Sequence, residues 1–139
     1  LSPNAADLPE IAEAAVGAGA EAVVLTNTLL AMAIDVETRR PVLGAGRGGL
    51  SGAAIHPVAV RAVFDVHEAL PQIPIVGVGG TASGIDAVEF LLAGASAVEV
   101  GTATFADPRA PRRILAELQD WCDRHGVARI ADLIGEAHG

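Results

Sequence analysis

The chain has 139 residues, of which 51% are hydrophobic and 3% aromatic, and it carries a formal net charge of -8. This length is sufficient for one hydrophobic core. The charge argues against nucleic acid as a partner, because a phosphodiester backbone is also negative. The abundance of small aliphatic residues excludes disorder and is typical of buried parallel strands with closely packed helices.

Compartment signals are few. Cys122 is the single cysteine, which rules out an intrachain disulfide and a cysteine metal cluster and fits a reducing cytoplasm. No apolar run reaches the eighteen or so residues of a membrane span, and residues 1–7 lack the order of a signal peptide. We therefore expect a cytoplasmic protein without a membrane partner. The first residue is Leu1 and not methionine, which suggests that an N-terminal portion precedes it.

The first expected elements are a helix and a buried strand. Asp7 is a capping residue before Pro9, and apolar residues at helical spacing predict a helix to about Gly17. The apolar run Ala22 to Asn27 is short and rich in β-branched residues, which favours a buried strand with a polar carboxyl end.

A long excursion and a second helix follow. Residues 28–52 contain too many glycines and arginines for a helix, so we expect an extended segment with a small hairpin around Asp35 to Val42. Loops of this length are usually functional. An apolar stripe then predicts a helix from His56 to about Leu70.

Two further strands and three helices complete the expected elements. Strands are predicted at Ile73 to Val78 and Ala97 to Gly101, with a helix between them that Ser83 caps. A final long helix should run from Arg109 to His125, followed by a short one near residues 128–134. The long helix is expected to bury an apolar stripe of Ile114, Leu115, Leu118, Trp121 and Cys122.

Strand-helix units without hairpins between them predict an α/β fold with a parallel sheet and right-handed crossovers. An open doubly wound sheet is the alternative to part of a closed barrel. Three strands alone would leave two bare edges and an apolar inner face. We therefore expect residues 1–139 to form a single partial domain that needs a missing half, a partner or a second copy.

Two glycine clusters follow consecutive strands, at Gly77 to Gly80 and at Gly101 to Ala103. Glycines at the carboxyl ends of parallel strands let backbone N–H groups approach an anion, and a following helix start adds positive dipole. This placement predicts a phosphate-binding cup. The alternative is that the glycines only form tight turns. A dinucleotide fingerprint fits less well, because the third glycine is missing.

Other polar positions leave the choice open. Asn27 and Thr28 follow a buried strand. The Asn27 amide could form hydrogen bonds with a planar ligand ring, or only with backbone groups of the local turn. The segment Gly48 to Gly52 could wrap a cofactor or form a flexible loop. His56 is interpreted as a satisfied capping residue and Cys122 as part of the core.

The motifs taken together resemble dihydroorotate dehydrogenases of type 1B over nearly the whole chain. They are Leu1-Ser2-Pro3-Asn4, Thr26-Asn27-Thr28-Leu29, Thr38-Arg39-Arg40-Pro41, Gly48-Gly49-Leu50-Ser51-Gly52, Gly77-Val78-Gly79-Gly80, Ala93-Gly94-Ala95-Ser96 and Gly101-Thr102-Ala103-Thr104-Phe105-Ala106-Asp107-Pro108.

The resemblance implies an FMN-binding (β/α)8 TIM barrel that oxidises dihydroorotate to orotate in pyrimidine biosynthesis. This chain would be its C-terminal part, with about three strand-helix units and the C-terminal helices. By motif position, the FMN phosphate would be held by Gly79, Gly80, Gly101 and Thr102. Thr26 and Gly52 would touch the flavin, and Asn27 and Thr28 would bind orotate.

The resemblance also implies which parts lie elsewhere. The catalytic cysteine base of the family lies on an earlier loop and a lysine near the flavin directly precedes the Leu1 segment, so no catalytic residue and no metal ligand is expected here. The parent enzyme would form homo-oligomers and pass electrons to NAD through a subunit with FAD and an iron-sulfur cluster. The long excursion and the Thr38 to Pro41 turn favour this type over the quinone-linked membrane class.

Two alternatives remain. The chain could be a non-catalytic half barrel that binds the FMN phosphate and pairs with itself. It could also belong to a related pyrimidine-reducing flavin barrel, such as the C-terminal part of dihydropyrimidine dehydrogenase or a dihydrouridine synthase. The acidic charge argues against the RNA enzyme, and the absence of cysteine clusters argues against an iron-sulfur segment.

Overall fold

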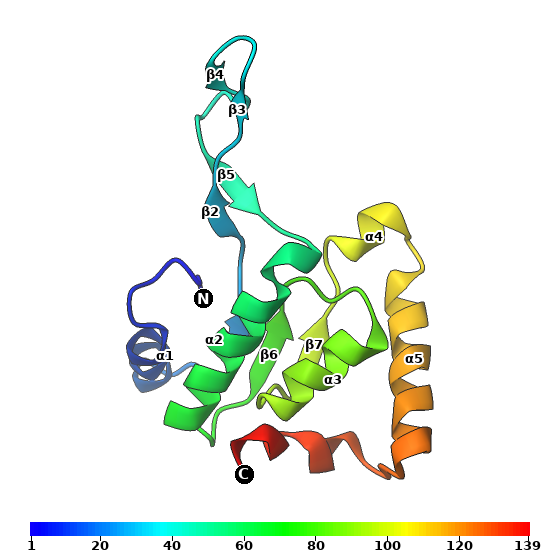
Figure 1. Cartoon of the computed structure of the whole chain (residues 1–139). Coiled ribbons are helices and arrows are strands. Elements are labelled where there is room, and N and C mark those ends of the chain that lie inside the picture. Colours follow the sequence, from blue (N-terminus) through cyan, green and yellow to red (C-terminus); the bar gives the residue numbers. More distant parts are fainter.

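The computed structural model describes residues 1–139 and contains one three-stranded parallel sheet (Figure 1). Its strands are β1 (Val23–Leu25), β6 (Ile75–Val78) and β7 (Ala97–Glu99), in the order β1-β6-β7. Both pairings are parallel, which confirms the sheet expected from the sequence. The assigned strands are shorter than predicted, although the Thr26 N–H still donates to the Val78 carbonyl at 2.7 Å.

The predicted helices form with nearly the expected ends. They are α1 (Leu8–Gly17), α2 (His56–Ala69), α3 (Gly84–Leu92) and α5 (Ala110–His125), joined by the short α4 (Ala103–Ala106) and the 3-10 turn η1 (Ala53–Ile55). The predicted short C-terminal helix is instead a pair of 3-10 turns, η2 (Ile130–Leu133) and η3 (Glu136–His138). No helix combines the length and the apolar character that crossing a membrane requires.

The core lies between the sheet and the helices α2 and α3. Its largest fully buried side chains are Phe90, Leu25, Ile75, Val63 and Val66. Phe90 packs directly beneath the sheet, because a Cβ atom on Gly77 would lie 2.7 Å from the Phe90 ring. This contact explains why β6 carries a glycine in its centre. It also fixes the height of the strand end that follows.

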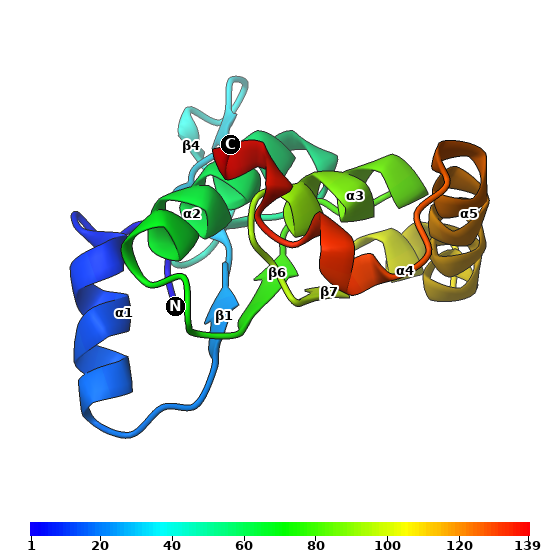
Figure 2. The same cartoon turned by 90° about the horizontal axis from the view of Figure 1, so that it is seen from below.

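Helices cover one face of the sheet and leave the other open (Figure 2). The register aligns Val24 with Val76 and Ala97, and alternation along the strands puts these residues on the face away from the helices. Val24 is 43% exposed. The open face is mostly apolar, as expected for three strands alone, but it also includes the exposed Glu99. The outer edge of β7 is bare, whereas Leu1 occupies part of the edge of β1, where its nitrogen donates to the Val24 carbonyl at 2.7 Å.

The excursion at residues 28–52 forms a narrow arm that projects away from the sheet (Figure 1). It contains two antiparallel ribbons, in which β2 (Leu29–Ala31) pairs with β5 (Gly48–Leu50) and β3 (Ile34–Asp35) pairs with β4 (Arg40–Pro41). The small hairpin is confirmed. The alternative of a flexible glycine loop is wrong for residues 48–50, because they form a paired strand.

One part of the predicted α5 stripe is wrong. Ile114 and Cys122 are buried, but Leu115 is 55% exposed. The packed stripe is narrower than the sequence suggested, because α5 contacts mainly α3 along one line of residues. The interpretation of Cys122 as part of the core is confirmed by its contacts in a cluster with Leu91 and Leu133.

Candidate functional site

The carboxyl ends of the three strands enclose a cavity of about 380 Å³ beside the base of the arm. Its lining includes all eight residues for which the sequence predicted a binding role: Thr26, Asn27, Thr28, Gly52, Gly79, Gly80, Gly101 and Thr102. Residues 76 positions apart in the sequence, Thr26 and Thr102, thus contribute to one site. No charged side chain lines the cavity, so its polar character comes from backbone groups, hydroxyls and one carboxamide.

Free backbone donors characterise the two glycine loops. The N–H groups of Gly79, Gly80, Gly101 and Thr102 donate to no backbone or side-chain acceptor of the chain. Gly79 and Gly80 have φ values of +138° and +74°. These angles favour glycine and allow successive N–H groups to gather around a small volume.

The glycines at 79 and 80 are also required by packing. A Cβ atom on Gly79 would lie 2.7 Å from the Ala59 Cβ, and one on Gly80 would lie 2.8 Å from the His56 backbone nitrogen. A Cβ atom on Gly101 meets nothing within 4 Å. The tight-turn explanation therefore accounts for the glycines of the first loop, whereas at Gly101 the fold has room for a side chain.

Two buried hydroxyls in the cavity wall have no hydrogen-bond partner, those of Thr26 and Thr81. A buried hydroxyl without a partner costs free energy, so native structures nearly always pair it. Both hydroxyls therefore lie without a partner in residues that line the cavity. Thr81 was missed by sequence reasoning, although its position directly after two glycines at a strand end is a recognisable signal.

The start of α3 is not available to a ligand, contrary to expectation. The Ala82 and Ser83 N–H groups both donate to Asp86 Oδ2 at 2.8 Å, and the Gly84 N–H donates to Glu117 Oε2 at 2.7 Å. Ser83 and Asp86 form the reciprocal capping box, which confirms Ser83 as the cap. Protein carboxylates already occupy the positive helix end, and the free donors lie earlier, in the glycine turn.

The carboxamide of Asn27 is exposed and makes no hydrogen bond within the chain, so it does not satisfy the local turn. Asn4 has that role. Its Nδ2 donates to the Thr28 carbonyl at 2.9 Å, and its Oδ1 accepts from the Leu30 N–H at 2.8 Å. The N-terminal segment therefore clamps the strand that leads into the arm, while Asn27 keeps both polar atoms free.

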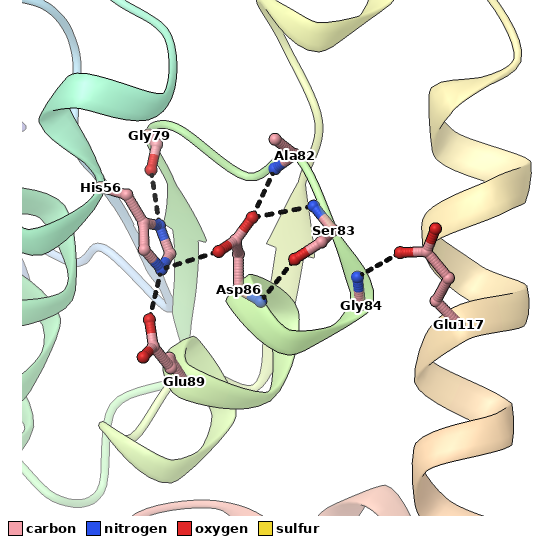
Figure 3. Close-up of polar contacts among 8 residues, drawn as sticks. All are labelled: His56, Gly79, Ala82, Ser83, Gly84, Asp86, Glu89 and Glu117. Carbon is pink, nitrogen blue, oxygen red and sulfur yellow. Dashed lines mark hydrogen bonds and ion pairs between the residues drawn. The ribbon is translucent and has the colours of Figure 1, made fainter.

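The prediction that His56 is a capping residue is wrong. This residue begins α2 but caps nothing there, because Ile55 is the N-cap. The buried ring instead contacts the Gly79 carbonyl through Nδ1 at 3.1 Å and Glu89 Oε2 through Nε2 at 2.8 Å (Figure 3). It connects α2 and α3 behind the glycine turn.

Two larger hollows of about 520 Å³ lie elsewhere, one between α1 and α2 and one along α2 and α3. Neither contains the strand-end glycines or the unpaired threonines. The strand-end cavity is the one that combines free donors, hydroxyls and an open carboxamide. We therefore take it as the functional site.

Comparison with known proteins gives a consistent result. The family described as dihydroorotate dehydrogenase matches residues 1–121. A protein of Pelobacter propionicus named "Dihydroorotate dehydrogenase B (NAD(+)), catalytic subunit" is 53% identical over 97% of this chain and 44% of its own length. One named for dihydroorotate dehydrogenase A (fumarate), from Solibacter usitatus, is 54% identical over the same shares. The chain spans less than half the length of these relatives.

Two solved structures of DHODH are also similar to this chain. DHODH from Eimeria tenella, in complex with ferulenol, superimposes with a TM-score of 0.83 at 31% identity, covering 99% of this chain and 37% of the other. The ligand-free form gives the same TM-score and covers 100% and 39%.

Proposed function

The chain belongs to the dihydroorotate dehydrogenase family, and we propose that it is the C-terminal part of an FMN-dependent (β/α)8 barrel that oxidises dihydroorotate to orotate. The observation that carries this proposal is the convergence of all eight motif residues on one cavity. Family membership also favours this activity over the related pyrimidine-reducing barrels.

The uncovered sheet supports the barrel. In a (β/α)8 barrel, helices cover the outside of a parallel sheet and side chains from the inner face fill the interior. The sheet here has helices on one face only, and Val24 is exposed on the other (Figure 2). Five further strands would cover this face, pair the free edge of β7 and complete the pairing that Leu1 begins at the edge of β1. The active site would then lie at the carboxyl ends of the strands, where the cavity is.

The donor set fits the phosphate of FMN. Gly79, Gly80, Gly101 and Thr102 would hold it through backbone N–H groups, and the Thr81 hydroxyl would add a further donor. A cup of neutral N–H donors suits a phosphate dianion. Thr26 and Gly52 would lie against the flavin, and the unpaired Thr26 hydroxyl is suited to a polar atom of its ring.

Asn27 and Thr28 would bind orotate. The free Asn27 carboxamide can donate to one ring carbonyl and accept from one ring N–H, which matches a planar pyrimidine. When bound, FMN supplies the acceptor for the hydride that leaves dihydroorotate. The residues of this chain bind and orient the two rings. Removal of the proton is assigned to a cysteine of the remaining barrel, since Cys122 is buried on α5 among Leu91 and Leu133.

The names of the relatives support an NAD-linked electron acceptor. Most of those compared are named catalytic subunits of NAD-linked enzymes, which supports a partner subunit with FAD and an iron-sulfur cluster. The Solibacter relative is named for the fumarate-linked class. We propose the NAD-linked arrangement in a homo-oligomeric enzyme, and a cytoplasmic location that fits the lone buried cysteine.

A chimera tests the proposal. This chain would replace the matching C-terminal 44% of the Pelobacter propionicus catalytic subunit, to which it is 53% identical. We expect a folded protein that retains FMN and converts dihydroorotate to orotate, with Asn27→Ala in the same chimera as a variant that raises KM. A folded, FMN-loaded chimera that forms no orotate would contradict the catalytic proposal and favour a non-catalytic FMN-binding half barrel.

A further inference from the structure

The turn after β6 is held from behind by a buried histidine. The His56 side chain is 9% exposed, and its ring packs edge-on against Phe90 with a centroid separation of 5.0 Å. Its two nitrogens contact Gly79 on one side and Glu89 on the other (Figure 3). Packing and two hydrogen bonds thus fix the ring orientation. The cavity described above lies on the opposite side of the same turn.

The chemistry of the partners determines where the ring carries hydrogen. A backbone carbonyl oxygen only accepts, so His56 Nδ1 must donate to the Gly79 oxygen. A carboxylate oxygen also only accepts, so Nε2 carries a hydrogen as well and donates it to Glu89 Oε2 at 2.8 Å, and the Asp86 carboxylate lies 3.8 Å away. Glu89 therefore orients the ring so that the Nδ1–H points at the turn. The same arrangement is seen in histidines whose second nitrogen is anchored by a carboxylate.

The contact between His56 and the Gly79 carbonyl determines which way the Gly80 N–H points. In a trans peptide the C=O and the following N–H point in opposite directions. Because the Gly79 carbonyl points at His56, the Gly80 N–H points away from it, and Gly80 lines the cavity with no acceptor in the chain. A rotation of this one peptide would replace the donor in the cup with a carbonyl oxygen, which repels an anion.

We propose that His56 is a positioning residue for the anion cup: its Nδ1–H, oriented by Glu89, fixes the Gly79–Gly80 peptide so that the Gly80 N–H is presented to a phosphate. This rests on the proposed function, which puts the FMN phosphate in the cup. His56 does not touch the phosphate. It acts through the peptide between them.

A metal ion is the other group that this cluster could hold, because ligand atoms of His56, Asp86 and Glu89 lie within 4.8 Å of one another. The hydrogen bonds argue against it. Asp86 Oδ2 already accepts from two backbone N–H groups, and Nε2 and Glu89 satisfy each other directly. The cluster is complete as a hydrogen-bonded unit that joins α2, α3 and the turn.

The test uses the chimera with the Pelobacter propionicus subunit and compares FMN with riboflavin, which lacks the phosphate. Dissociation constants for both are measured by flavin fluorescence, and their ratio reports the contribution of the cup. We expect His56→Leu to lower the preference for FMN over riboflavin about tenfold, while riboflavin affinity is retained. The reason is that the Gly80 N–H is no longer held toward the phosphate, so one hydrogen bond to the charged phosphate is lost. The ³¹P resonance of bound FMN should shift as well. His67→Leu on the same helix is the matched control and should leave the ratio unchanged.

Two conservative variants keep the test independent of folding. His56→Asn has an amide at the Nδ1 position and should retain the ratio to within about threefold, whereas His56→Gln has its amide at the Nε2 position and should lose it. Equal ratios in wild type, His56→Leu and His56→Gln would overturn the proposal while the proposed function stands. If a chelator abolished the preference for FMN over riboflavin, the cluster of His56, Asp86 and Glu89 would hold a metal ion, and this result would also overturn the proposal. Failure of the wild type to prefer FMN would overturn both.

Discussion

The two sides of the cavity differ in how firmly the chain holds them. Side chains from three helices fix the loop after β6: His56 holds Gly79, Asp86 holds Ala82 and Ser83, and Glu117 holds Gly84. The opposite side, formed by β1 and the arm, is exposed, and the Asn27 side chain there makes no hydrogen bond in the chain. A binding site is effective when its donors are held in place before the ligand arrives. The loop after β6, on the side proposed for the phosphate, meets this condition within this chain. The side proposed for the flavin and orotate rings is not held in this way.

The difference has a sequence origin. The groups that hold the loop after β6 come from α2, α3 and α5, and all of them lie within residues 56–117. Gly84 even allows α5 to approach, since a Cβ there would lie 2.6 Å from the Leu118 nitrogen. The side formed by β1 and the arm has only the N-terminal segment beside it, through Asn4.

The largest effect is expected from Gly80→Ala. The added Cβ would lie within 2.9 Å of both the His56 backbone and the Gly52 carbonyl oxygen, at a φ of +74°. We expect roughly 2 to 4 kcal/mol lower stability and loss of FMN binding. Gly101→Ala is the matched control, because its Cβ meets nothing within 4 Å, and it should change stability by less than about 1 kcal/mol. Urea denaturation measures both, and equal losses would contradict the comparison.

The next effect concerns the anchor from α5. The Arg113 guanidinium and then the Gly84 N–H hold the pKa of Glu117 below its ordinary value. A lowered carboxyl pKa contributes stability above the unfolded value and loses it as the pH falls through the folded value. Because the Glu117 side chain is partly exposed and its charge is screened by solvent, Glu117→Gln should cost less than about 1 kcal/mol at neutral pH and nothing in strong acid.

The surface pair Arg61–Asp65 provides the control for that prediction. Asp65→Asn removes an exposed i,i+4 ion pair at 3.0 Å and should cost less than about 0.5 kcal/mol. Unfolding curves for the two variants between neutral and acidic pH give the comparison. A Glu117 variant whose deficit persists in acid would show that its carboxylate charge is not what anchors α3.

Thr81→Val should separate ligand binding from stability. Its buried hydroxyl has no partner in the chain, so replacing it with a methyl group should leave stability unchanged or raise it by up to about 1 kcal/mol. FMN affinity should nevertheless fall several-fold, because the cup loses a donor. Thermal unfolding with and without FMN measures both quantities. A variant that is less stable without ligand would contradict the assignment of this hydroxyl to the cofactor.

The smallest effect on stability is expected at Asn27. Its exposed side chain makes no hydrogen bond in the chain, so Asn27→Ala should change the unfolding free energy by less than about 0.5 kcal/mol. In the chimera with the Pelobacter subunit, orotate affinity should fall about tenfold. Asn4→Ala is the contrast, because it removes two backbone contacts and should lower stability. Unchanged orotate binding in Asn27→Ala would contradict the proposal that the Asn27 carboxamide forms hydrogen bonds with the orotate ring.

Sequence pattern predicted the parts that depend on local spacing. Helix ends followed from caps such as Asp7 and Ser83, and strand-end glycines predicted which loops meet. The contacts of His56 with Gly79 and of Glu117 with Gly84 were not predicted. They join residues 23 and 33 positions apart, and which side chains meet depends on how helices pack. Leu115 was misplaced for the same reason, since the stripe is set by contact with α3.

The central claim is that the phosphate cup is complete within this chain. The most direct test is a fluorescence titration of the purified 139-residue chain with FMN and with riboflavin, with its size in solution measured at each step. We predict saturable binding of FMN, at least about tenfold tighter than that of riboflavin. No binding, or equal affinity for the two flavins by a folded chain, would contradict the claim and mean that the cup forms only with the rest of the barrel.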